Sequence, residues 1–184
     1  MFGKAFSVMM LTLLLMNLLT LLSAVQRVEA VGTVYIRANG SVDPATAPVL
    51  SFDNVTYTLT DDIYGGIVVE RDSIVVDGAG NAVHGLGDGT GINLTTRSNV
   101  TIENVEINGF NSGVCLSSSF NNGIYENNIA DSYFGIYFWS SSNNSISGNS
   151  ITNNYLGIYF SFSSNNSVTG NNITANKGIG TYLV

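Results

Sequence analysis

The sequence predicts an all-β protein built as a single-stranded parallel β-helix, a solenoid in which each repeat makes one coil. A block that reads Asn-Asn-Ser-Ile-Ser-Gly-Asn-Ser-Ile begins at Asn143, and close copies begin at Asn121 and Asn165. These blocks lie 22 residues apart, and a fixed period of this size is typical of solenoids. A second unit, of the type Gly-Ile-Tyr-Phe, recurs between them with the same period.

Apolar residues form columns when the repeats are aligned. Within one strand they lie two positions apart, as Ile136 and Phe138 do, which is the period of a β-strand and not of a helix. We therefore expect parallel strands stacked about 4.8 Å apart, in about five coils. The four columns are Ile102, Ile124, Ile146 and Val168; Ile107, Ile129, Ile151 and Ile173; Ile92, Val114, Ile136 and Ile158; and Leu94, Leu116, Phe138 and Phe160.

Asparagine columns are expected at the corners of the coils. Stacked side-chain amides can hydrogen-bond to the copies above and below, and Asn is a common turn residue. We interpret these columns as structural and not as ligand sites. They consist of Asn99, Asn121, Asn143 and Asn165, and of Asn127, Asn149 and Asn171.

The repeats resemble the right-handed parallel β-helix repeat family. The resemblance covers about Ile67 to Tyr182 and includes Ile74-Val-Val-Asp-Gly-Ala-Gly-Asn81 and Ser98-Asn-Val-Thr-Ile102. This family includes NosD-like proteins and the carbohydrate-binding and sugar hydrolase (CASH) domains of the pectin-lyase-like fold. The resemblance implies a right-handed coil and functions that range from polysaccharide lyase or hydrolase to surface protein and periplasmic copper-processing protein. Because the shared residues build the coil, they indicate the fold more strongly than the function.

The first 30 residues indicate export. Lys4 precedes an apolar run over residues 5–22, and Val28-Glu-Ala30 fits cleavage after a small residue. The run is also just long enough to be an uncleaved membrane anchor. Both alternatives place the remaining chain at the cell surface, in the periplasm or in the extracellular space, with membrane contact only through this segment.

Two further regions are expected after the export segment. Residues 31–66 show strand patterns but no repeat, and we predict a β-rich cap that covers the end of the solenoid. Residues 67–184 hold the repeats. Gly178-Ile179 follows Gly157-Ile158 by 21 residues and no polar cap follows, so we expect a truncated solenoid or end-to-end self-association there.

Composition argues against several partners. The chain has 6 Lys and Arg against 13 Asp and Glu, and a net charge of −7. An acidic chain of this kind is a poor partner for nucleic acid or anionic lipid. A single cysteine, Cys115, forms no internal disulfide, and its thiol is expected to be unreactive.

Three carboxylates are the candidates for catalysis. Glycosidases need two carboxyl groups about 5–10 Å apart. Glu103 and Glu126 are expected on neighbouring coils, and Asp131 lies nearby in sequence. Solvated surface acids are the favoured alternative, since the motifs of polygalacturonase-like proteins are missing. A lyase would need cationic groups, and the coils offer only Arg71, Arg97 and Lys177.

No metal or cofactor site is predicted. Copper sites use imidazole, thiolate and thioether ligands. Beyond residue 30 the chain holds only His84 and Cys115 of these types and no methionine.

Aromatic residues are expected on one outward flank of the coils. Tyr137 and Tyr159 share a column, Tyr133 and Tyr155 share another, and Trp139 extends the first strand. Ring faces suit the C–H surfaces of sugars, although the rings could instead pack on one another. We predict a structural or carbohydrate-binding role, with a polysaccharide-acting hydrolase or lyase as the alternative and a NosD-type copper protein as a less favoured one.

Glycosylation is expected at exposed sequons of an exported chain. Seven Asn-x-Ser/Thr triplets occur, and several of them fall in the proposed asparagine ladders, where a glycan would block stacking. Asn39, Asn54 and Asn93 are therefore the predicted sites.

Overall fold

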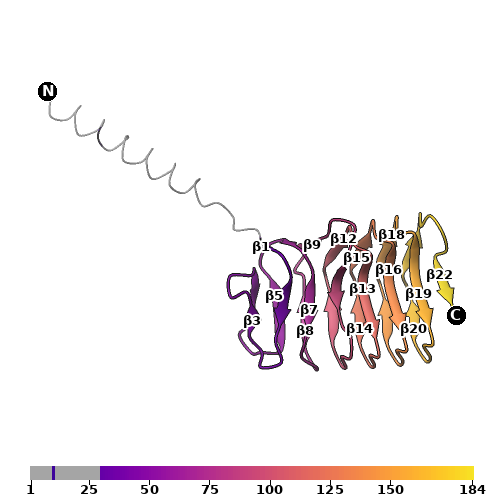
Figure 1. The fold of residues 1–184 in the computed structure, drawn as a ribbon, viewed down its shortest axis with the longest axis horizontal. Coiled ribbons are helices and arrows are strands. Elements are labelled where there is room, and N and C mark those ends of the chain that lie inside the picture. Colours follow the sequence, from indigo (N-terminus) through magenta and orange to yellow (C-terminus); the bar gives the residue numbers. More distant parts are fainter. Residues whose placement is uncertain (1–9, 11–29) are drawn as a thin grey trace.

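The computed structural model describes Met10 and residues 30–184, and it shows a β-solenoid of about six turns (Figure 1). Each turn contributes one strand to each of three sheets, and nearly all neighbouring strands are parallel. The predicted parallel β-helix is confirmed. The predicted export segment, residues 1–30, lies outside the described residues apart from Met10 and Ala30. Among the described residues, no helix is both long and apolar enough to cross a bilayer.

The sheets are named A, B and C here. Sheet A contains β1 (Ala30–Val31), β6 (Ile63–Tyr64), β9 (Ala82–His84), β12 (Glu106–Asn108), β15 (Asn128–Ala130), β18 (Ser150–Thr152) and β21 (Asn172–Thr174). Sheet B contains β3 (Val42–Asp43), β2 (Val34–Ile36), β7 (Ile67–Val69), β10 (Thr90–Asn93), β13 (Ser112–Ser117), β16 (Phe134–Trp139), β19 (Leu156–Ser161) and β22 (Thr181–Leu183). Sheet C contains β4 (Val49–Leu50), β5 (Thr56–Leu59), β8 (Val75–Asp77), β11 (Thr101–Glu103), β14 (Gly123–Tyr125), β17 (Ser145–Ser147) and β20 (Ser167–Thr169).

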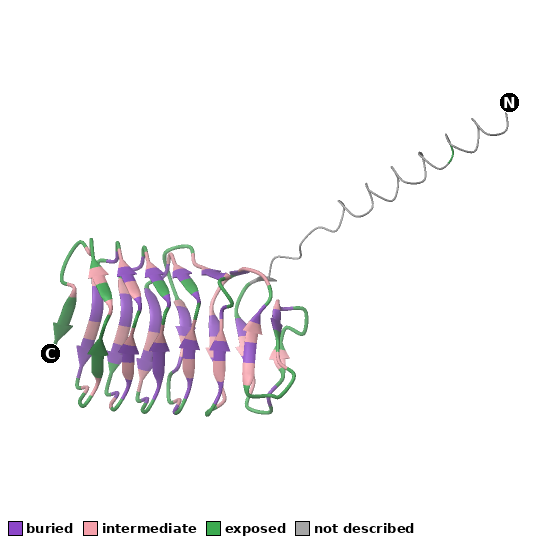
Figure 2. Cartoon of the chain, turned by 180° about the vertical axis from the view of Figure 1, so that it is seen from behind, coloured by how far each residue is buried: buried purple, intermediate pink, exposed green. Residues whose placement is uncertain are grey.

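The core is a stack of like residues inside the three sheets. Ile102 pairs in register with Ile124, and Ile124 with Ile146, so the 22-residue period is the register of the sheet. All three side chains are fully buried. Figure 2 shows buried positions along the strands and exposed positions at the turns. This burial stabilises the fold, because every turn removes apolar side chains from contact with water.

Residues 31–66 form a turn of the solenoid, which raises the number of coils from the predicted five to about six. Strand β2 pairs in parallel with β7, β5 with β8, and β6 with β9. The spacing here is irregular, which hid the repeat: Val34 pairs with Ile67, but Ile63 pairs with Val83. Short antiparallel strands, β3 and β4, then cover the outer edges of β2 and β5.

From Ser118 onward, the corners of the coils combine one residue of left-handed backbone with one inward-pointing Asn or Ser. The predicted ladder of Asn99, Asn121, Asn143 and Asn165 is wrong in this respect. These four residues are exposed and take φ values of 54° to 59°, a conformation that Asn tolerates better than most residues. The ladder consists of the residues that follow three of them, namely Asn122, Asn144 and Asn166.

The second predicted ladder, Asn127, Asn149 and Asn171, is confirmed. The Oδ1 atom of Asn149 accepts the backbone N–H of Asn127 at 2.9 Å, and its Nδ2 donates to the carbonyl oxygen of Ile124 at 2.8 Å. The same Nδ2 donates to Oδ1 of Asn171 at 2.9 Å. Two further ladders use Ser119, Ser141 and Ser163, and Ser132, Asn154 and Asn176. Among the described residues, no buried side-chain N or O atom lacks a partner.

The last turn differs from the sequence-based alignment. Thr181 pairs with Ile158 and Tyr182 with Tyr159, so the step is 23 residues and not 21. The corner between Thr174 and Thr181 is one residue longer than the corner that it stacks on. Strands β20 and β22 are exposed at every position.

We predict that Asn149→Ala destabilises the fold by about 2–6 kcal/mol, because it leaves the buried N–H of Asn127 and carbonyl of Ile124 without partners, at about 1–3 kcal/mol each. Asn143→Gly is the control and should change stability little, since glycine adopts left-handed backbone freely. Urea unfolding followed by circular dichroism measures both. Equal effects of the two substitutions would show that the inward amides do not hold the corners.

Candidate functional site

A column of tyrosines runs along the outward face of sheet B. Tyr137 of β16 and Tyr159 of β19 are register partners, and their rings lie 5.4 Å apart with an angle of 3° between the planes. Tyr182 of β22 continues the column at 5.6 Å from Tyr159. The column exists because buried Ile136 and Phe138 flank Tyr137 in a strand whose side chains alternate between faces.

A second aromatic stack lies beside this column, at the corner between sheets A and B. The rings of Tyr133 and Tyr155 are stacked with centroids 4.8 Å apart. Phe134 joins the two stacks, since its ring lies 4.7 Å from Tyr133 and 5.0 Å from Tyr137. The predicted aromatic residues Tyr133, Tyr137, Tyr155 and Tyr159 therefore form one continuous surface.

Trp139, the fifth predicted aromatic residue, lies apart from this surface. It occupies the far end of β16 and packs edge-on against Phe162, with centroids 5.0 Å apart. Sequence reasoning missed Tyr182 and Phe134. The alternation in Thr181-Tyr-Leu183, which matches Ile158-Tyr-Phe160, was the signal that could have revealed Tyr182.

A shallow hollow of about 460 Å³, here called the aromatic hollow, lies between the two stacks. None of its lining residues carries a charge. Burial raises the pKa of the Tyr137 phenol, and the neighbouring Tyr159 and Cys115 raise it further. Burial likewise raises the pKa of the Cys115 thiol, against a smaller opposing effect of a hydrogen bond with Thr95. The lining residues are Asn111, Ser112, Cys115, Tyr133, Phe134, Tyr137, Leu156 and Tyr159.

The three candidate carboxylates lie in different settings. Glu126 and Asp131 are exposed corner residues with φ values of 55° and 52°. Glu103 lies within sheet C, where its register partners are Asp77 and Tyr125.

Glu126 shares an open hollow of about 510 Å³ with two other carboxylates, Asp77 and Glu106, whereas Glu103 and Asp131 do not line it. The Asp77 side chain accepts a hydrogen bond from Asn104 at 3.2 Å, and Glu106 accepts one from Asn108 at 3.3 Å. The grouping at this hollow is thus not the expected pair of Glu103 and Glu126.

A larger hollow of about 680 Å³ lies toward the N-terminal end of sheet B. It is called the N-terminal hollow here. Sequence patterns did not reveal it, because it is lined by five glycines and by residues from four successive turns with irregular spacing. Its lining residues are Gly32, Thr33, Tyr64, Gly65, Gly66, Val68, His84, Gly85, Leu86, Asp88, Gly89, Thr90, Asn93 and Phe110.

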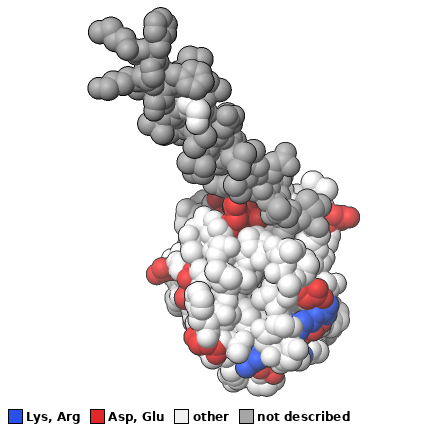
Figure 3. Space-filling view, turned by 90° about the vertical axis from the view of Figure 1, so that its left-hand side faces the viewer, with Lys and Arg blue, Asp and Glu red and all other residues white. Residues whose placement is uncertain are grey.

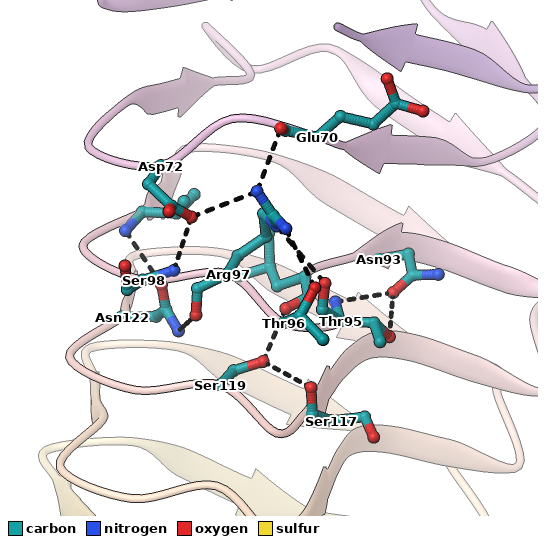
Figure 4. A network of polar contacts seen from close by, with 12 residues as sticks. Glu70, Asp72, Asn93, Thr95, Thr96, Arg97, Ser98, Ser117, Ser119 and Asn122 are labelled. Atoms are coloured by element: carbon teal, nitrogen blue, oxygen red, sulfur yellow. Dashed lines mark hydrogen bonds and ion pairs between the residues drawn. The ribbon is translucent and has the colours of Figure 1, made fainter. Parts of the chain in front are cut away.

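Arg97 lies at the other edge of sheet B, where it meets sheet C (Figure 4), and Arg37 follows β2 at the same edge. Arg97 lies 3.4 Å from Asp72 and donates to the backbone oxygen of Glu70 at 3.0 Å. Arg37 bonds Glu70 at 3.0 Å and also Asp43. Figure 3 shows blue and red atoms side by side on the end of the solenoid that faces the viewer, where most of the surface is uncharged. These cations are paired with acids and line neither the aromatic nor the N-terminal hollow.

The predicted glycosylation sites have different exposures. Asn39 and Asn54 are exposed, whereas Asn93 is half-buried at the N-terminal hollow, where its Oδ1 accepts the N–H of Thr95 at 2.9 Å. The argument that ladder packing blocks the other sequons does not hold for Asn99, Asn143 and Asn165, because these residues lie outside the ladders and are exposed. Glycosylation itself stays a prediction.

Comparison with known proteins places the chain in a family. Residues 45–184, more than half of the chain, match the family described as periplasmic copper-binding protein (NosD). The chain belongs to the NosD family. A comparison with curated proteins found no significant match. Among solved structures, an alginate lyase from Paenibacillus sp. str. FPU-7 is similar, with 16% sequence identity and a TM-score of 0.48. The match covers 83% of this chain and 64% of the lyase chain.

Copper, which the NosD family description names, does not fit the donor atoms of this member. His84 belongs to β9 of sheet A and Cys115 to β13 of sheet B, and the two side chains line different hollows. The Nδ1 atom of His84 is 2.9 Å from Oδ1 of Asn108, which holds the imidazole in a hydrogen bond. Within residues 30–184, no three His, Cys, Asp or Glu side chains are grouped so that they could hold a metal ion.

We predict that Cys115 reacts slowly with a thiol-directed reagent at pH 8. Because burial raises its pKa, the folded protein holds less thiolate at a given pH than a free cysteine does. The rate should therefore rise at higher pH than for the same cysteine in the urea-unfolded chain, and unfolding at pH 8 should accelerate labelling. Equal rates in the folded and unfolded chain would contradict the buried setting.

Proposed function

We propose that this NosD-family protein is exported and binds a neutral glycan on the aromatic face of sheet B, without cleaving it. The observation that carries the proposal is the aromatic hollow, where Tyr137, Tyr159 and Tyr133 surround a concave surface without charge. Tyrosine rings offer flat apolar faces to sugar C–H groups and hydroxyls to sugar oxygens. Tyr133 and Tyr155 are each 47% exposed, so their rings are accessible at the rim.

Export is supported by two independent features. The first is the pattern of residues 1–30, in which a lysine, an apolar run and a small-residue site follow one another. The second is the description of the NosD family as periplasmic. The single free cysteine is compatible with this compartment, because burial keeps the Cys115 thiol largely neutral.

Charge supports a neutral ligand over an acidic one. The chain carries a net charge of −7, and neither Lys nor Arg lines the aromatic hollow. An acidic sugar chain would meet repulsion from the whole molecule and would find no cation to pair with its carboxylates. Neutral sugars need only hydrogen bonds and ring contacts, which Asn111, Ser112 and the tyrosines can supply.

A polysaccharide hydrolase is the second candidate function. The open hollow that groups Asp77, Glu106 and Glu126 favours it, because paired carboxyl groups are the catalytic requirement of glycosidases. Against it, Glu106 and Glu126 are exposed, and a catalytic acid usually needs a buried setting that raises its pKa.

We expect the double substitution Tyr137→Ala with Tyr159→Ala to weaken binding to neutral polysaccharides by about fivefold to a hundredfold, since two ring contacts of roughly 0.5–1.5 kcal/mol each are lost. Tyr125→Ala, on sheet C, is the matched control and should bind like the wild type. Affinity electrophoresis and calorimetry against a panel of neutral and uronate polysaccharides measure the effect. Unchanged retention of the double variant on every bound glycan would refute the proposed face.

We also expect no release of reducing ends from any polysaccharide that the protein binds. The same panel, incubated with wild type and with Glu126→Gln, tests this with a reducing-sugar assay. Release by the wild type that falls at least about a hundredfold in Glu126→Gln would instead establish the hydrolase, because general acid or base catalysis contributes effects of about that size.

A further inference from the structure

The N-terminal hollow arises from two corners of unequal length between sheets A and B. Tyr64 and His84 are register partners, and so are Ile67 and Ile92. The chain therefore crosses from sheet A to sheet B through Gly65 and Gly66 alone in one turn, but through the whole segment 85–91 in the next. A long corner beside a short one leaves a space of about 680 Å³.

Glycine makes the short corner possible. A Cβ atom on Gly65 would lie 2.1 Å from the backbone oxygen of Gly32, and one on Gly66 would lie 2.3 Å from that of Thr90. Gly65 also has a φ of 149°, which L side chains rarely adopt. At Gly65 and Gly66 the backbone is thus packed too closely for a side chain, which keeps this part of the hollow open.

The lining of this hollow combines ring faces with hydrogen-bonding groups. The rings of Tyr64 and His84 lie side by side, with centroids 4.9 Å apart and planes 32° apart. Leu86, on the long corner, is 100% exposed and contributes an uncovered apolar side chain to the rim. Asp88 and Asn93 provide oxygen atoms, and neither Lys nor Arg lines the space. This chemistry resembles that of the aromatic hollow: apolar, ring-lined and without a cation.

The two hollows adjoin each other along the solenoid axis. Thr90 and Asn93 line the N-terminal hollow, and their register partners Ser112 and Cys115 line the aromatic hollow. At the corner, Phe110 belongs to the first hollow and the next residue, Asn111, to the second. Both hollows therefore open on the same face of sheet B, and together they follow the strands from β2 to β19.

We propose that the N-terminal hollow is a second subsite for the same neutral glycan, which receives one end of a sugar chain lying parallel to the solenoid axis. This inference rests on the proposed function of the aromatic face and adds the direction and length of the ligand. The centres of the two hollows are about two to three turns apart, or roughly 10–15 Å at about 4.8 Å per turn. A disaccharide then occupies one hollow, and a chain long enough to span three turns occupies both.

The test compares disaccharides and octasaccharides of whichever neutral glycan the panel identifies. We expect the full wild-type chain to bind the octasaccharide at least tenfold more tightly than the disaccharide. Tyr64→Ala combined with Leu86→Ala should remove this gain and leave disaccharide affinity unchanged. The matched control, Leu50→Ala combined with Phe52→Ala, removes one exposed leucine and one exposed aromatic ring outside both hollows and should keep the gain. Unfolding midpoints show that each variant is folded.

Protection of Cys115 provides a second readout that separates the possible failures. Because Cys115 lines the aromatic hollow, either oligosaccharide should slow its labelling in the wild type. If labelling is slowed but affinity does not rise with length, or if the Tyr64 and Leu86 variant keeps the rise, the second subsite is refuted and the aromatic site stands. If neither length binds or slows labelling, the proposed function fails and this inference fails with it. Equally tight binding of uronate octasaccharides would overturn the assignment to neutral glycans.

Discussion

Hydrogen bonds from inward-pointing amides and hydroxyls at the corners of the later coils are the constraint on which this structure depends. A chain that turns this sharply leaves buried backbone N–H and C=O groups that no sheet partner can reach. The ladder residues supply those partners one turn away: Asn149 accepts from the backbone of Asn127 and donates to the carbonyl of Ile124. Each ladder side chain accepts the backbone N–H of the residue 22 positions earlier, which is apolar at the start of three ladders, as at Val100 and Val105. The ladders therefore require one period, and the apolar columns follow the same register.

This internal regularity leaves the outward faces free to differ. On sheet B the outward position becomes aromatic in the later turns, with Tyr137, Tyr159 and Tyr182 in one stack. The arginines Arg37 and Arg97 instead pair with acids where sheet B meets sheet C in the earlier turns. The outward face of sheet B is therefore aromatic and uncharged, whereas at its edge with sheet C the arginine charges are neutralised by neighbouring acids. Such a face suits a neutral, ring-stacking ligand better than an ionic one.

Departures from the period create the most concave parts of the surface. The corner at Gly65 and Gly66 is as short as the one before it, at Gly32 and Thr33, but the next corner, up to Gly91, is longer. A solenoid of identical coils would present an even surface, since each corner would lie directly on the one before it. Here the mismatch opens the N-terminal hollow next to the aromatic one, so that the proposed binding face extends across most of the rod.

The sequence by itself determined the fold, the register of the core and the outward stacking of four tyrosines, because each of these depends on a residue's position within a 22-residue period. Only the tertiary structure decided the rest. It added a turn from residues 31–66, moved one asparagine ladder by one position to Asn122, and brought Tyr182 into the column. It also grouped Glu126 with Asp77 and Glu106 and opened the N-terminal hollow. The physical reason is that periodic stacking is a local property of the repeat. Hollows and corners instead depend on small differences in length between neighbouring turns, and the effect of these differences is visible only when the turns lie on one another.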